Sequence, residues 1–515
     1  GGTYGDKEIV KKLNGKYAWD FTTANMDRIS RYYLDRGNPD KTNFKILVEE
    51  KRKHQSAQWS QMDKRVGKVK AFMANNNINP SDLYKRVEIP GAGPHDGTAK
   101  FSISDLRMAM LAVRNDQTRD AFTYGNLFDN VERTKMGPDA MVVAGEQRLN
   151  KVLEAIDNQL TPQQKALAEV IAKDFDDNFD RLNAAAINYS QNDIQKVSNY
   201  VPLVRINEVF STLSEEILTD LLRGHGFTNK AGPNNSMTKA RFDIIPNSQT
   251  AMKLDLFSTY MDSVDKQEHF IEFSDYHREL INIYGENGSK DSREIRETIK
   301  HTYGDIGLRY IDDYINEVAN PQNYKQRNYA DALLHKLRGN FAVAALAGRV
   351  VSVANQLATS PIPYVAYAPA QMVTAAAKCV SNPRGFIAEV EGKSPFLRNR
   401  QRDPIYHIWT SMDDGLAKTI GEKGMKGREW ADRWSVAIGW EAVYENELSK
   451  THNEEAAIKK ADDITYRCQP TADSAEMSPL FRNNSEAMRM LTLFGSEIHV
   501  AYPHMRFATV IAASD

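Results

Sequence analysis

Histidine and acidic side chains are the first places to look for chemistry, because they bind metal ions and transfer protons near neutral pH. The chain has 11 histidines, and the arrangement closest to a metal site is His269, Glu272 and His277. In a helix, residues 269 and 272 share a face, whereas residue 277 aligns with them only in part. We therefore interpret these side chains as the exposed polar face of an amphipathic helix, and we expect no bound metal.

Catalysis by a pair of carboxylates requires two acidic side chains that face each other. Adjacent acidic residues occur at positions 176–177, 312–313, 413–414 and 462–463. Neighbouring residues of a helix point about 100° apart and do not meet, so we interpret these pairs as solvated helix faces. A peptidoglycan-cleaving transglycosylase needs one catalytic glutamate, and Glu441, which follows Gly439 and Trp440, is the candidate for that role.

Nucleotide and acyl-transfer chemistry also have sequence signatures. Loops that hold phosphate groups carry the motif GxxxxGKS or GxxxxGKT, or a GxGxxG that follows a strand. We find none of these motifs in the sequence. The GxSxG motif of serine hydrolases is also missing. Gly91 and Gly93 precede Pro94 and His95, which do not begin a helix. These patterns argue against kinases, NTPases, hydrolases and nucleotidyltransferases, and we expect no cofactor.

Two groups of basic residues could contact a nucleic acid or a partner protein. The first group lies within residues 41–70 and includes Lys64, Arg65 and Lys68. Acidic residues are interleaved there, which favours an exposed helix face with many salt bridges over a nucleic-acid contact. The second group consists of Arg398, Arg400 and Arg402. Arginine suits bidentate contacts with phosphate or carboxylate groups, but these side chains could instead hold neighbouring helices.

Length and composition limit the class of protein that positions these residues. A chain of 515 residues is too long for one hydrophobic core, so several domains are expected. The net charge of −2 provides no overall basic field that would attract nucleic acid. Cys379 and Cys468 cannot build a disulfide framework, and we interpret them as free thiols in a reducing compartment.

Helical periodicity is the dominant pattern. Thr161 is a good N-cap, Pro162 suits the first helical position, and Gln164 completes a capping box. Apolar residues then recur at three- and four-residue spacing, which predicts a helix over residues 165–187. Further helix starts are expected at Ser214 and at Asn453.

Strand signals are few, and short extended pieces are expected only at residues 87–90 and 242–246, both of which end in proline. The sequence therefore predicts an all-α protein of irregular helical bundles with few or no strands. Breaks occur at residues 89–98, 224–246 and 319–323. We accordingly expect three domains, over residues 1–158, 159–325 (with a long loop at 224–246) and 326–515.

One apolar stretch stands out. Arg349 is the only charged side chain between residues 340 and 377. About 20 apolar residues suffice to span a membrane, but polar residues and three prolines interrupt this run. We expect a buried hairpin of helices in the C-terminal domain, with membrane contact after a conformational change as the alternative. A mean hydropathy of −0.55 argues against permanent residence in a membrane.

The two ends of the chain also carry information. The first residues include neither an initiator methionine nor the apolar core of a signal peptide. At the other end, residues 497–513 are rich in apolar side chains and stop without a helix cap. We expect the natural protein to continue beyond Asp515.

Several short sequence segments occur together in a recognisable order. Residues 160–205 hold a helix pair that ends in Asn-Tyr-Val-Pro, and Asn-Gln-Leu follows at 355–357. Further phrases lie at residues 394–400, at the tryptophans 430, 434 and 440, at residues 454–471 and at residues 488–500. This ordered set resembles the large polyvalent-protein-associated domains of phages and prophages. The resemblance covers about residues 160–500 and is strongest over residues 340–500.

The resemblance implies a phage setting and a modular, mainly helical parent protein, and some relatives resemble internal virion or ejection proteins. It supplies no catalytic residues. Our leading hypothesis is therefore a non-enzymatic module that acts by assembly or delivery, carried in the virion and then in the host cytoplasm or envelope. Its expected partners are other virion proteins or further copies of itself. The alternatives are a peptidoglycan-cleaving enzyme with a dispersed site, and a nucleic-acid-binding module that accompanies injected DNA.

Overall fold

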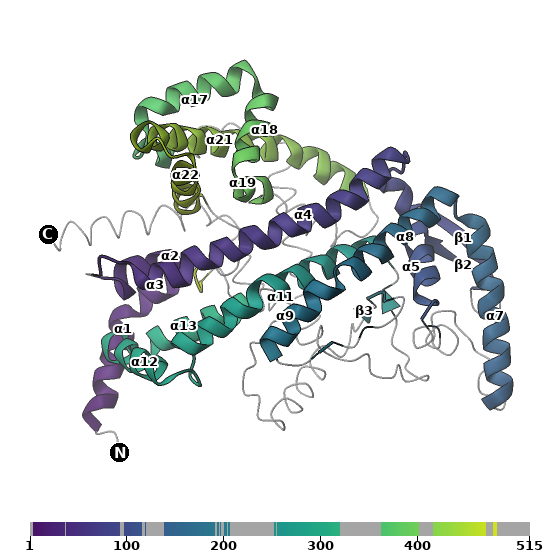
Figure 1. The fold of residues 1–515 in the computed structure, drawn as a ribbon, viewed down its shortest axis with the longest axis horizontal. Coiled ribbons are helices and arrows are strands. Elements are labelled where there is room, and N and C mark those ends of the chain that lie inside the picture. The colour runs from purple at the N-terminus through teal and green to yellow at the C-terminus, as the bar shows by residue number, and fades with distance from the viewer. Residues whose placement is uncertain are drawn as a thin grey trace. The chain divides into compact units, whose positions relative to one another are not determined.

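The computed structural model of this chain (Figure 1) describes residues 4–36, 38–92, 97–115, 119, 138–190, 193–194, 196, 200–202, 204–205, 252–253, 255–319, 362–400, 416–469 and 477–480. Helices make up most of these residues, and the strands among them form two short antiparallel pairs, β1–β2 and β3–β4. The predicted all-α, multi-helix fold is confirmed. The helix start at Ser214 and the extended piece at residues 242–246 lie outside the described residues.

The chain divides into two compact units, which differ from the three consecutive segments expected from the sequence. The central unit is residues 57–278, and the split unit combines residues 1–56 with residues 279–515. The expected boundary at residue 158 falls inside the central unit, where one hydrophobic core takes residues from both sides of it.

The elements of the central unit, in chain order, are α4 (Lys51–Asn75), η3 (Pro80–Tyr84), β1 (Arg86–Pro90), β2 (Thr98–Ser102), α5 (Ile103–Ala112), α7 (Pro138–Gln159), α8 (Pro162–Asp177), α9 (Phe179–Ser190), β3 (Val204–Arg205), β4 (Met252–Lys253) and α11 (Leu256–Tyr284), of which α4 and α11 also extend into the split unit. Helices α4 and α11 run side by side (Figure 1), and Gln58 donates a hydrogen bond to Asp265 between them at 2.9 Å. The core beneath them includes Val69, Ile171 and Tyr260.

Local signals explain where several of these elements begin. The Thr161 hydroxyl accepts a hydrogen bond from the backbone N–H of Gln164, whose side chain accepts one from Thr161 in return, so the predicted capping box is confirmed. The helix predicted over residues 165–187 is interrupted, because α8 ends at Asp177 and α9 begins at Phe179. Asn178 at the break bonds to Arg181 and Gln267 through its side chain, and asparagine favours such breaks over helix interiors.

The predicted loop at residues 89–98 connects the two strands of a hairpin. Strand β1 pairs with β2 in antiparallel register, with Val87 opposite Phe101. The extended piece expected at residues 87–90 is thereby confirmed within β1, whereas β2 had no clear signal in the sequence. After β1, Gly91 adopts a left-handed φ of 77°, a conformation that costs glycine little.

The elements of the split unit are α1 (Tyr4–Thr23), α2 (Met26–Ile29), the π-helical segment η1 (Ser30–Leu34), α3 (Thr42–Phe44), the π-helical segment η2 (Lys45–Glu50), α12 (Lys290–Tyr303), α13 (Asp305–Ala319), α16 (Ile362–Val365), α17 (Pro369–Ser381), α18 (Pro383–Lys393), α19 (Pro395–Arg400), α21 (Leu416–Thr451) and α22 (Glu454–Cys468). Aromatic rings join its N-terminal residues to α12 and α13. The Phe21 ring lies 5.5 Å from the rings of Tyr303 and Tyr310, measured between centroids. The Tyr310 hydroxyl donates to the carbonyl of Ala24 at 3.0 Å.

The last described helices pack on α21, which contacts α16, α17, α18 and α22. Asn453 caps α22 by accepting a hydrogen bond from the N–H of Ala456, as its sequence predicts.

In the apolar stretch 340–377, residues 340–361 lie outside the described residues. The remaining part differs from the expected buried hairpin, because Ile362 and Val373 of α16 and α17 are exposed. Among the described helices, none is long and apolar enough to cross a membrane.

Candidate functional site

Glu441, the catalytic candidate from the sequence, is a buried residue of α21 with a fixed partner. Its Oε1 lies 3.1 Å from the Nζ of Lys378 on α17, and Glu445 contacts the same ammonium group. The hydrogen bond to Glu445, followed by that to Glu441, raises the pKa of Lys378. Because the carboxylate is 2% exposed and its charge is paired, this geometry suits packing of α17 on α21 better than proton delivery to a polymeric substrate.

Arg65, predicted as part of an exposed basic group, is buried in the central unit with 4% of its surface exposed. Its guanidinium donates to Asp174 of α8 at 2.8 Å and to Glu268 of α11 at 2.8 Å. A third bond reaches Gln267 at 3.0 Å. Such fork-shaped donation satisfies several buried acceptors at once, so Arg65 joins α4 to α8 and α11 and is not available to a nucleic acid.

The other predicted basic residues that the structure describes lie on α4 and α19. Lys64 is exposed on α4, and the Nζ of Lys68 lies 3.8 Å from Asp174. Arg398 donates to the carbonyls of Glu391 and Gly392 at the end of α18, which is the structural role that the sequence left open. The Arg400 side chain and the whole of Arg402 lie outside the described residues.

The two histidines of α11 lie in different surroundings. His269 stacks on Phe273, whereas burial lowers the pKa of His277 to about 4. His277 is fully buried beside Tyr189, so its predicted exposure is wrong. Glu272 instead contacts Arg181 of α9. Within the described ranges, no three histidine, cysteine or acidic side chains are placed to hold a metal ion.

The acidic pair Asp462–Asp463 of α22 points in two directions, as neighbours on a helix should, but both side chains are largely buried. Asp462 accepts hydrogen bonds from the Ser394 hydroxyl and from the Trp440 indole, each at 2.7 Å. Burial raises the pKa of Asp462 to about 6, although both hydrogen bonds oppose the shift. The interpretation of this pair as a solvated face is therefore wrong.

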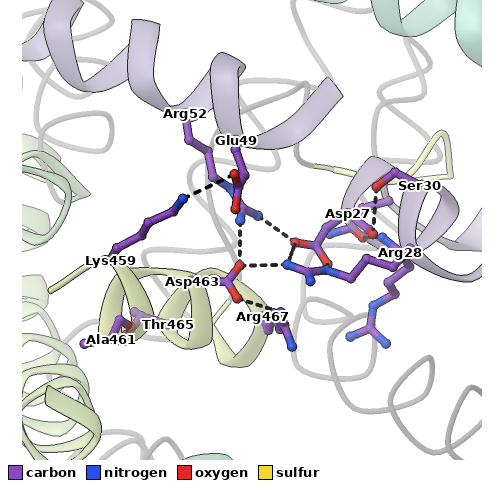
Figure 2. A network of polar contacts seen from close by, with 12 residues as sticks. Asp27, Arg28, Ser30, Glu49, Arg52, Lys459, Ala461, Asp463, Thr465 and Arg467 are labelled. Carbon is purple, nitrogen blue, oxygen red and sulfur yellow. Dashed lines mark hydrogen bonds and ion pairs between the residues drawn. The ribbon is translucent and has the colours of Figure 1, made fainter. Parts of the chain in front are cut away.

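Asp463 is the centre of a charged network, shown in Figure 2. It accepts from Arg31 of η1 at 2.9 Å, from Arg52 of α4 at 3.1 Å and from Arg467 of its own helix at 2.6 Å. Asp27 of α2 bonds to the first two arginines from the other side. At the edge of the network, Lys459 contacts Glu49 at 3.2 Å. The network therefore joins α22 to residues near the N-terminus, all within the split unit.

The electrostatics of this network favour a fixed arrangement. Burial opposes the charge of Asp27, but the field of Arg52 and Arg31 lowers its pKa to about 2. The Arg52 guanidinium also stacks 4.0 Å from the ring centroid of Tyr466, and the Arg31 guanidinium lies 3.4 Å from that of Phe44. Each cation is therefore held by a carboxylate and an aromatic face together, an arrangement typical of structural clusters.

The surface of α16 and α17 is the feature that most resembles a contact site for another molecule. Val373 and Val380 are 73% and 79% exposed, and Ile362 of α16 is 62% exposed. On the opposite side of α17, Ala375 and Cys379 are buried. We call the exposed residues Ile362, Val365, Ala370, Val373, Ala377 and Val380 the α16–α17 face.

Sequence reasoning missed the α16–α17 face because it treated residues 340–377 as one buried core. The spacing of residues 370, 373, 377 and 380 could have revealed this face, because these positions form one apolar stripe of a helix. Small residues form a second, separate stripe on the same helix. The partners of Asp463 had no comparable signal, because Arg31 precedes it by 432 positions.

Comparison of the chain with models of protein families, with curated proteins and with solved structures found no match.

Proposed function

We propose that this chain is a non-enzymatic helical module of a large phage-encoded protein, and that it acts by assembly through the α16–α17 face. The phage setting comes from the resemblance of its phrases over residues 160–500. In this proposal the protein is carried in the virion and enters the host cytoplasm or envelope with the genome.

The observation that carries the assembly role is the exposure of large apolar side chains along one helix face. Exposed apolar side chains that gather on one face are a feature of contact sites for proteins or membranes. Residues 370, 373, 377 and 380 follow the alternating three- and four-residue spacing with which one helix receives another. The two alanines among them allow close approach. We therefore expect the partner to be an amphipathic helix with an apolar stripe of its own.

Site-specific photo-crosslinking tests this role. A benzoylphenylalanine at Val373 is expected to crosslink, in purified phage particles, to an apolar helix stripe of a virion protein, and mass spectrometry identifies the peptide. The same group at Glu389, an exposed position of α18, is the control. Equal crosslinking from both positions, or absence of the protein from particles, would contradict the proposal.

A paired substitution tests the same face without a probe. Val373→Asp with Val380→Asp is expected to leave helicity and melting temperature unchanged, because both side chains are already exposed, and to abolish incorporation into particles. Normal incorporation would reject the face as the assembly surface. If wild type floats with anionic liposomes and the double variant does not, the face contacts membranes instead.

A further inference from the structure

A cavity of about 490 Å³ lies between the start of α18 and the middle of α21, and none of its described lining residues belongs to the α16–α17 face. Asn382, Pro383, Arg384, Trp430 and Trp434 line it. This volume falls within the range of small-molecule sites, roughly 300 to 1,000 Å³. Among the described residues, the lining combines two indole rings with one cation and includes no acidic side chain.

The tryptophans present usable aromatic surface. Their ring centroids are 5.8 Å apart at an interplanar angle of 67°, so the rings stand edge to face and do not cover each other. Trp430 is 39% exposed. Its position is fixed by Arg433, whose guanidinium lies 5.5 Å from the Trp430 ring centroid while it holds Glu391 at 2.6 Å. The aromatic platform is therefore built before any ligand arrives.

Two polar groups of the cavity lining have nothing to bind among the described residues. The buried indole N–H of Trp434 donates to no acceptor there. Arg384 is exposed and makes no hydrogen bond or ion pair there, unlike Arg433. The Trp434 N–H has almost no accessible surface, so Arg384 is the one of these two groups that is open to a ligand.

We propose that this cavity binds one nucleotide of a single-stranded nucleic acid. A base stacks on Trp430 beside the Trp434 ring, and the Arg384 guanidinium pairs with a phosphate group. Aromatic stacking combined with a nearby cation is how proteins hold single strands without reading sequence. A neutral glycan or a proline-rich peptide would use the indoles but would leave Arg384 without a role. The inference is independent of the assembly role, because the α16–α17 face has no part in it.

Fluorescence anisotropy with a labelled 15-nucleotide oligo-dT and the full chain tests the site. Trp430→Ala is expected to weaken binding roughly tenfold, the usual value of one stacked base, and Arg384→Gln is expected to weaken it through the lost phosphate contact. Loss of one phosphate contact should also reduce the slope of log Kd against log salt by about 0.7 for Arg384→Gln. Trp434→Phe keeps an aromatic ring but reduces its area, so a smaller loss of affinity is expected.

Matched controls are available within the same unit. Arg293→Gln removes an exposed cation of α12, and Trp19→Ala removes an exposed tryptophan of α1; both should bind oligo-dT within twofold of wild type. Circular dichroism confirms folding of each variant, and Trp430→Phe should restore part of the affinity lost in Trp430→Ala. The proposal is overturned if oligo-dT does not bind at low salt or binds Trp430→Ala unchanged. It is equally overturned if chitooligosaccharides or a proline-rich peptide, and not oligo-dT, protect Trp430 from quenching by iodide.

Discussion

At the scale of single residues, the central unit depends on a buried cation. Arg65 lies among Asp174, Gln267 and Glu268, which are themselves buried. Bringing such charges out of water is costly, and their mutual hydrogen bonds offset the cost only while every member is present. The hydroxyl of Tyr260 adds a further bond to Asp174 at 3.1 Å, so the cluster joins α4, α8 and α11 through polar contacts inside an apolar core.

Removing this cation should destabilise the central unit. Arg65→Met keeps an unbranched side chain but leaves two carboxylates without their main partner, and we expect a loss of about 3 to 5 kcal/mol in the free energy of unfolding. Lys64→Gln, one position earlier and exposed, should change it by less than about 0.5 kcal/mol. Urea unfolding of both variants measures the difference, and equal stability would show that the cluster contributes little.

Only part of this residue-scale organisation could be predicted from the sequence. Lys64 and Arg65 are adjacent cations, yet one is exposed and the other buried, because neighbouring positions on a helix face different environments. The same applies to Asp462 and Asp463, whose separate directions were predicted and whose burial was not. Burial depends on which element packs opposite, and that information is not local.

At the scale of elements, the signals that could be predicted were those that need only neighbouring residues. The capping box at Thr161 and the cap at Asn453 involve contacts three positions apart. The break at Asn178 and the π-helical segment η1 depend on distant partners, such as Gln267 for the Asn178 amide. The exposed side of α17 was missed for the same reason, since composition alone does not distinguish the stripe that meets α21 from the stripe that remains open.

Gly439 shows how one position controls the packing of two elements. A Cβ atom at Gly439 of α21 would lie 2.5 Å from the Tyr364 ring of α16, closer than real contacts allow. Gly439→Ala should therefore displace Tyr364 and destabilise the split unit by about 1 to 3 kcal/mol. Hydrogen exchange should accelerate across residues 362–368.

A glycine in an open position provides the control for this change. Gly392 lies within α18, and a Cβ atom there would meet nothing within 4 Å. Gly392→Ala should be neutral or stabilising by up to about 1 kcal/mol, because alanine is the better helix former. If the two variants exchange alike at residues 362–368, the close approach of α16 to α21 does not contribute to stability.

At the scale of the whole molecule, the split unit is assembled from the two ends of the described chain. Asp463 meets Arg31 and Arg52 across 432 and 411 positions, respectively. Closing loops of this length is entropically costly, and the buried charges and aromatic faces near Asp463 offset part of that cost. A division into consecutive domains was the natural reading of the sequence, because sequence breaks cannot show that the first 56 residues belong with the last ones.

Removing the acceptor at the centre of this network tests whether it holds the split unit together. Asp463→Ala leaves Arg31, Arg52 and Arg467 with Asp27 as the remaining carboxylate of the inner network, and guanidinium groups that are mostly buried then repel one another. We expect a loss of about 3 kcal/mol in the stability of the split unit. Hydrogen exchange should accelerate together in residues 26–52 and 454–468, although just over 400 positions separate them, while residues 57–278 keep their protection. Glu455→Gln, an exposed change on the same helix, should leave all three regions unaltered. Faster exchange confined to residues 454–468 would mean that α22 is stabilised locally and that the N-terminal residues are held to the split unit by the aromatic cluster around Phe21 alone.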